Sequence, residues 1–94
     1  MTYTVRVELH SSQFNPYFEL LHKAMEQEGF KRLITSDVGF TYHLPKGEYD
    51  IVTTSSRSQV LAAAERAVQK TRISAEILVT ESAGRSWSGL TLKK

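Results

Sequence analysis

Residues 2–10 read Thr2-Tyr3-Thr4-Val5-Arg6-Val7-Glu8-Leu9-His10, with polar and apolar side chains in strict alternation. Successive side chains of a β-strand point to opposite faces of a sheet, so this stretch predicts a strand with one buried and one open face. The side chains expected on the buried face are Tyr3, Val5, Val7 and Leu9. Those expected on the open face are Thr4, Arg6, Glu8 and His10.

The rest of the chain continues this strand with a regular order of periodicities. A helical stripe from Asn15 ends at Gly29, and extended segments follow at residues 30–35, 40–44 and 49–54, the last two separated by Pro45-Lys46-Gly47. Ser56 and Gln59 form a capping box before a second helical stripe, and alternation returns at residues 73–80. The order βαββαβ predicts an α+β, ferredoxin-like fold, in which one antiparallel sheet carries both helices on one face.

Length and composition indicate one globular domain spanning residues 1–94, in which residues 82–94 form a short edge strand or a flexible tail. The 94 residues include no cysteine, which excludes disulfides, cysteine-bound zinc and thiol catalysis. The formal net charge of +2 is too small for a strong non-specific nucleic-acid binder. No apolar run approaches the length of a bilayer span, and the N-terminus does not resemble a secretory signal. We therefore expect a cytoplasmic protein without a membrane partner.

The open face of the first strand is the first place to look for chemistry. Glu8 and His10 lie two residues apart on that face, and Asp50 on the neighbouring strand joins them if Tyr49 and Ile51 point inward. Carboxylates are the ligands that Mg²⁺ prefers, so Glu8 and Asp50 are candidate metal ligands. An ordinary solvated face with mixed charge would carry the same residues.

Histidines and scattered cations supply the remaining candidates. His10 and His22 are candidate general acid–base groups, because imidazole exchanges protons near neutral pH. Arg6, Lys23 and Arg32 are candidate contacts to the phosphates of RNA, although basic residues spread over several elements also coat ordinary surfaces.

Several stretches of the chain resemble the GhoS family, the endoribonuclease antitoxins of type V toxin–antitoxin systems. The resemblance runs through Tyr3-Thr4-Val5, Ser11-Ser12, the helix exit from Met25 to Phe30, Val38-Gly39, and Leu44 with Tyr49-Asp50-Ile51-Val52-Thr53-Thr54-Ser55. It implies a βαββαβ domain that cleaves the single-stranded messenger RNA of a toxin. Glu8 matches an acidic family position which, in similar CRISPR-associated nucleases, binds metal between two subunits. Leu20 and His22 occupy the places of two family arginines, with Lys23 adjacent.

The resemblance therefore predicts an endoribonuclease that grips single-stranded RNA on the open sheet face, with no DNA partner expected. Catalysis would come either from a cation such as Mg²⁺ held by Glu8, or from a histidine that helps the 2′-hydroxyl of RNA attack the adjacent phosphate. The alternative is a non-catalytic module of the same fold that forms a homodimer or docks RNA or a protein. Exposed Leu78 and Trp87 motivate this alternative.

Overall fold

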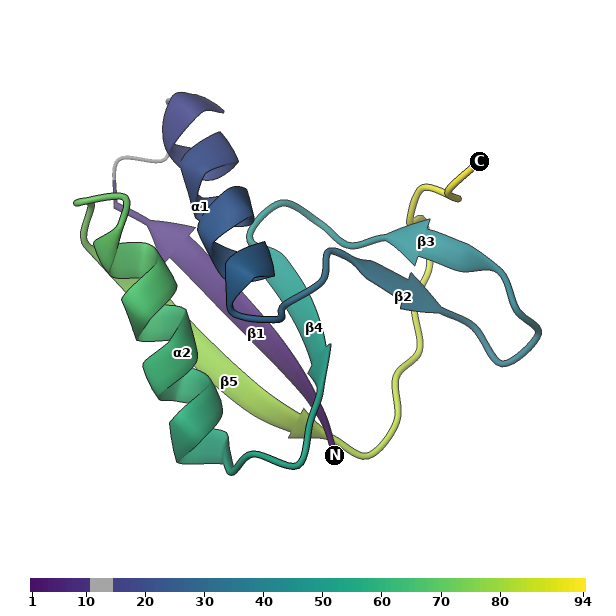
Figure 1. Ribbon diagram of the computed structural model, residues 1–94. Coiled ribbons are helices and arrows are strands. Elements are labelled where there is room, and N and C mark those ends of the chain that lie inside the picture. The colour runs from purple at the N-terminus through teal and green to yellow at the C-terminus, as the bar shows by residue number, and fades with distance from the viewer. Residues whose placement is uncertain (11–14) are drawn as a thin grey trace.

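The chain has the predicted α+β, ferredoxin-like order of elements (Figure 1). A computed structural model describes residues 1–10 and 15–94. Within these residues the helices are α1 (Asn15–Gln27) and α2 (Arg57–Gln69). The strands are β1 (Thr2–Leu9), β2 (Leu33–Thr35), β3 (Thr41–His43), β4 (Glu48–Val52) and β5 (Ala75–Ser82). No helix in these ranges is long and apolar enough to cross a bilayer.

Strand β1 is the centre of the main sheet, and β4 and β5 pair with it antiparallel on either side. The first and last strands are thus neighbours, as the predicted fold requires. The predicted strand at residues 30–35 is shorter than expected. Only Leu33–Thr35 form β2, which pairs with β3 in a separate two-stranded hairpin. Lys31 makes a single antiparallel bridge to Asp50 on β4 and so extends the main sheet by one residue.

The third predicted strand is divided at Pro45-Lys46-Gly47 into β3 and β4, where the sequence placed its interruption. Gly47 has a φ of +86°, in the left-handed region that L side chains rarely adopt. A Cβ added to Gly47 would lie 2.6 Å from the carbonyl oxygen of Val7. The Val7 N–H in turn donates a 2.7 Å hydrogen bond to the Gly47 carbonyl. This close approach sets where β4 joins β1.

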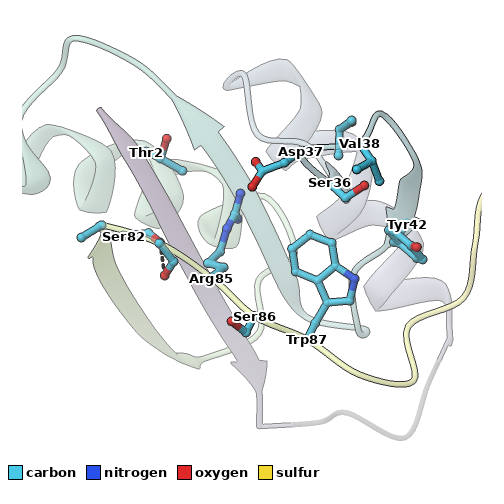
Figure 2. A pocket seen from close by; sticks show the side chains of 12 residues that line it. Thr2, Ser36, Asp37, Val38, Tyr42, Ser82, Arg85, Ser86 and Trp87 are labelled. Carbon is cyan, nitrogen blue, oxygen red and sulfur yellow. Dashed lines mark hydrogen bonds between the residues drawn. The ribbon is translucent and has the colours of Figure 1, made fainter.

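Residues after β5 lie along the β2–β3 hairpin and not along the edge of the main sheet. The Thr91 carbonyl accepts a 2.9 Å hydrogen bond from the His43 N–H, and the Lys93 N–H donates to the Thr41 carbonyl at 2.8 Å. Figure 2 shows Trp87 facing Tyr42, with ring centroids 5.5 Å apart and an edge-on geometry. The C-terminal segment therefore pairs with β3 through one isolated β-bridge, between Tyr42 and Leu92, and does not form a longer edge strand.

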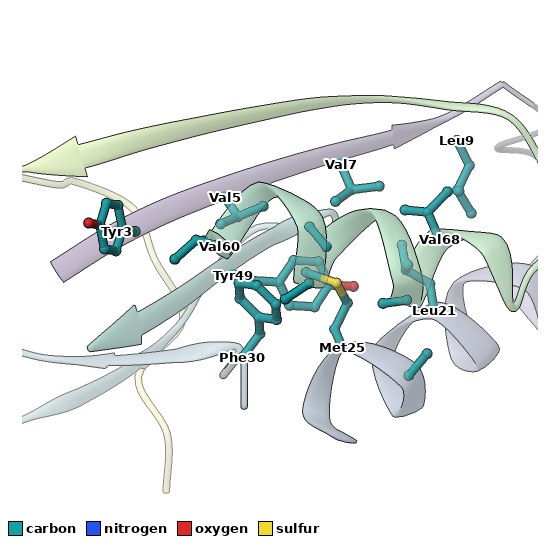
Figure 3. Packing of buried hydrophobic residues seen from close by; sticks show 14 of the residues in the cluster. Tyr3, Val5, Val7, Leu9, Leu21, Met25, Phe30, Tyr49, Val60 and Val68 are labelled. Atoms are coloured by element: carbon teal, nitrogen blue, oxygen red, sulfur yellow. The ribbon is translucent and has the colours of Figure 1, made fainter. Parts of the chain in front are cut away.

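The core lies between the sheet and the two helices (Figure 3). Its largest side chains with almost no exposure are Tyr3, Tyr49, Phe30, Leu9, Leu21, Met25, Val5 and Val60. The four predicted inward residues of β1 are all buried. The predicted capping box of α2 is confirmed, because the Gln59 N–H donates to Ser56 Oγ at 3.2 Å and the Ser56 N–H donates to Gln59 Oε1 at 2.8 Å. Both helices cover the same face. The other face of β1 is exposed at Arg6, Glu8 and His10, whereas near Thr4 the side chain of Arg85 covers Asp50 of β4.

Candidate functional site on the open face of the sheet

Strand register decides which polar side chains share the open face. Arg6 on β1 is opposite Glu48 on β4 and Leu78 on β5. Glu8 is directly opposite Glu76, and both are exposed. Opposite residues of an antiparallel pair point to the same side of the sheet and bring their Cβ atoms within about 4.5–5.5 Å. The strongest concentration of negative charge on this face is therefore the pair Glu8 and Glu76.

His10 is held at the end of this acidic pair by contacts to two side chains of the neighbouring segment. Its Nδ1 lies 3.0 Å from Ser74 Oγ, and its Nε2 lies 3.3 Å from Glu76 Oε2. Its backbone N–H donates a 2.9 Å hydrogen bond to the Ser74 carbonyl. The imidazole is 48% exposed. A histidine that is oriented by a carboxylate and open to solvent can exchange a proton with a bound molecule.

A shallow hollow of about 290 Å³ lies beside this histidine–carboxylate pair, lined by Arg6, Glu8, Glu76, Ile77 and Leu78. It combines one guanidinium group, two carboxylates and an apolar wall. Glu76 and Ser74 were absent from the residues that the sequence singled out. Their positions in the alternating strand could be read from the sequence, but the register that sets them against Glu8 and His10 could not.

His22 does not belong to this site. It lies on α1, is only 8% exposed, and its Nδ1 is 2.5 Å from the hydroxyl of Tyr49. Burial lowers the pKa of His22, and the positive charge of Arg32 acts in the same direction. Burial raises the pKa of Tyr49. The phenol is therefore protonated and donates to a neutral imidazole. The structure thus places His22 in the core on the helical side of the sheet, and not on the open face.

Asp50 is on the open face but does not meet Glu8. It is opposite Thr4, four residues along β1 from Glu8, which corresponds to roughly 13 Å of strand. Asp50 is 8% exposed, and its Oδ1 accepts a 2.6 Å hydrogen bond from Arg85 Nη1. The predicted pair of metal ligands is therefore not assembled. Among the described residues, no three His, Asp or Glu side chains are grouped so as to hold a metal ion.

The predicted RNA-binding cations are divided between the two sides of the molecule. Arg6 is on the open face, whereas Lys23 is an exposed residue of α1, which covers the other face. The positive charge of Arg32 lowers the pKa of buried His22, and Arg32 lines a hollow together with Glu26 of α1. Its neighbour Lys31 is opposite Asp50 and shares the open face with Arg6. The alternation that buries Phe30 could have identified Lys31 in place of Arg32.

A second hollow, of about 520 Å³, separates the hairpin from the C-terminal segment (Figure 2). Asp37, Tyr42, Arg85 and Trp87 contribute to its lining. The Arg85 side chain that borders it is already bound to Asp50. None of the predicted site residues lines this hollow.

No protein-family model matches the chain, and no curated protein matches it in sequence.

Proposed function

We propose that this chain is an endoribonuclease of the antitoxin type that cleaves single-stranded RNA, with His10 as its acid–base group. The observation that supports this proposal is the exposed His10 imidazole, oriented by Ser74 and Glu76 on the uncovered face of the sheet. The resemblance of residues 49–55 to the GhoS family points to the messenger RNA of a toxin as the substrate. Cleavage of RNA at its own 2′-hydroxyl needs no cofactor, and a single positioned base can start it.

In this reaction the 2′-hydroxyl takes the place of Ser74 Oγ at His10 Nδ1, and Nδ1 accepts its proton while that oxygen attacks the adjacent phosphorus. The bond from phosphorus to the 5′-oxygen breaks, and the leaving oxygen takes up a proton from water, to which the imidazolium returns the proton that it accepted. The products are a 2′,3′-cyclic phosphate and a 5′-hydroxyl. Glu76 is hydrogen-bonded to the same ring and stabilises the imidazolium that forms. DNA lacks the 2′-hydroxyl and is not a substrate for this chemistry.

Arg6 and Lys31 are the proposed phosphate contacts. Lys31 is opposite Asp50, which is opposite Thr4 on β1, and Arg6 is two residues along β1 from Thr4. Two strand spacings and two residues correspond to roughly 12 Å between the backbones of Arg6 and Lys31. Glu8 lies between Arg6 and His10 on the same strand, where its charge repels a phosphate. A divalent cation would reverse this effect, because the oxygens of Glu8 and Glu76 are suitable ligands for Mg²⁺. Such an ion would supply charge stabilisation to the same reaction.

The test is cleavage of a labelled single-stranded RNA by the full chain, with excess EDTA and with Mg²⁺. Histidine catalysis predicts cutting in EDTA, and His10→Gln lowers the rate by about 10²- to 10⁴-fold, the usual contribution of a general base. His43→Gln is the matched control, because His43 is exposed on β3 and far from the site. Equal rates for His10→Gln and the wild type would refute the proposed role of His10.

Glu8→Gln separates the two sources of catalysis. Without a metal, removal of the Glu8 charge strengthens RNA binding and leaves cutting in EDTA intact. If a cation does the work, the same substitution abolishes cutting, and EDTA does so in the wild type.

The non-catalytic binding module is the second candidate, because Leu78 is 63% exposed on the same face. RNA binding without the appearance of a cyclic phosphate under either condition would favour this module over the ribonuclease.

A further inference from the structure

Strand β5 forms an outer edge of the main sheet. It pairs with β1 over its whole length, from Ala75 to Ser82, in one uninterrupted register. In the described part of the chain, no strand or isolated bridge pairs with its other edge. The strand contains neither proline nor lysine, two residues that commonly prevent an edge strand from pairing with another chain. Its backbone donors and acceptors are therefore available to a partner strand.

Apolar side chains flank this edge on both sides of the sheet. On the open face, Leu78 is 63% exposed. On the helical face, α2 runs along β5 at the outside of the molecule (Figure 1). The two elements leave a groove of about 460 Å³, lined by Ser56, Arg57, Ser58, Leu61, Ile77 and Val79. Leu61 is 36% exposed above this groove.

The exposed face of α2 carries a charge pattern that complements itself. Arg57, Leu61 and Glu65 are spaced four residues apart and so lie along one side of the helix. Arg57 and Glu65 are exposed, and no ion pair joins either of them to another described residue. If a second copy of α2 is placed antiparallel, with the two Leu61 side chains in contact, each Arg57 faces the Glu65 of the other copy. Two-fold symmetry therefore makes two ion pairs from one helix surface.

We infer that the chain forms a symmetric dimer in which β5 pairs antiparallel with β5 of a second copy, centred on Leu78. In this register Leu78 meets the second copy's Leu78 on the open face, and Glu76 is opposite Thr80. Ile77 is opposite Val79 on the helical face. Glu76 and Glu81 of one copy are then opposite uncharged residues of the other copy, Thr80 and Ala75 respectively. A register centred on Glu76 would instead place two like charges directly opposite each other, which destabilises strand pairing.

The strand register and the helix pattern specify the same symmetry axis. Ile77 and Val79 flank Leu78 along the strand, and both line the groove with Leu61. An axis through Leu78 therefore also passes close to Leu61. The result is a continuous sheet of β4, β1 and β5 from each copy, with all four helices on one face and both open faces on the other. This interface leaves His10 exposed and does not depend on the proposed cleavage of RNA.

Sedimentation equilibrium of the full chain over a wide concentration range tests the dimer. The expected average mass rises from that of one chain to that of two. Leu78→Lys places two lysines against each other at the axis and shifts the equilibrium to the monomer. The matched control is Val52→Lys, since Val52 is 72% exposed on β4, away from the proposed interface. Circular dichroism shows that each variant is folded, which is expected because both positions are exposed.

A charge exchange on α2 tests the register. Arg57→Glu and Glu65→Arg each turn two attractive contacts into two repulsive ones, and each raises the dissociation constant by about tenfold. The double variant restores both pairs and recovers the wild-type constant. A wild-type chain that stays monomeric at every concentration would overturn the inference. So would a dimer whose dissociation constant is the same in the wild type and in Leu78→Lys, or a double variant no tighter than the two single ones.

Discussion

Replacement of Gly47 by alanine tests the contact that divides the third strand and fixes β4 against β1. Gly47 has a φ of +86°, and an alanine Cβ would lie 2.6 Å from the Val7 carbonyl oxygen. A non-glycine residue in the left-handed region costs about 1–2 kcal/mol. The backbone must also shift to relieve the close contact, which weakens the 2.7 Å hydrogen bond from the Val7 N–H to Gly47 and costs about 1 kcal/mol more. We therefore expect Gly47→Ala to lower the free energy of unfolding by about 2–3 kcal/mol.

This loss is a large fraction of the stability of a small domain, about 5–15 kcal/mol. At roughly 4–8 °C per kcal/mol for a domain of this size, the melting temperature should fall by roughly 8–24 °C. Gly39→Ala is the matched control, because Gly39 has a φ of +94° but nothing within 4 Å of an added Cβ. The free energy of unfolding of Gly39→Ala should fall only by the cost of the left-handed conformation, about 1–2 kcal/mol. Urea and thermal unfolding measure both variants, and equal losses for the two would refute the role given to the Val7 contact.

Three further predictions follow from the pairs described above. The lowered pKa of His22 means that the unfolded chain binds more protons in mild acid, so the free energy of unfolding should fall as the pH drops below about 6.5. Urea unfolding should show a weaker dependence on pH between 7 and 5 in His22→Leu, and an unchanged dependence would contradict the neutral imidazole. Arg85→Leu leaves Asp50 buried without its partner and should lower the free energy of unfolding by about 1–3 kcal/mol. A red shift of Trp87 fluorescence would report the release of the C-terminal segment. RNA binding through Arg6 and Lys31 should give a slope of about −1.4 in a plot of log affinity against log salt, and Arg6→Gln should reduce its size by about 0.7. A slope that Arg6→Gln leaves unchanged would show that the RNA lies elsewhere.

The fold could be predicted because each element carries a local signal of its own. The alternation in residues 2–10 identified the inward residues of β1, and the capping box of Ser56 and Gln59 marked the start of α2. The strand boundaries differ from the expectation by one to three residues, and two differ most. The strand expected at residues 73–80 is β5, Ala75–Ser82, and the strand expected at residues 30–35 keeps only three residues. In both cases the strand ends where its pairing with a neighbouring strand ends, and that pairing cannot be read from the sequence.

The candidate site was predicted less well because it depends on register and layer. A helical stripe places His22 on α1 but does not say whether its side chain enters the core, where the hydroxyl of Tyr49 provides a partner. Asp50 was correctly placed on the open face, but only the register with Thr4 shows that it is far from Glu8. Arg85 lay in a segment without periodicity, so its ion pair with Asp50 had no sequence signal.

The charge of the open face limits what a ribonuclease on it can do. Asp50 is neutralised by Arg85, so Glu8, Glu48 and Glu76 oppose the attraction of Arg6 and Lys31 for a phosphate. A ribonuclease with such a face would bind RNA weakly, and its selectivity would have to come from the hydrogen bonds and stacking of a particular sequence. In the proposed dimer the two open faces lie side by side on one sheet, so a single RNA strand can contact the cations of both copies. Bivalent contact of this kind raises affinity without any new type of interaction, and dimerisation is then the step by which a face whose carboxylates outnumber its cations could hold a polyanion.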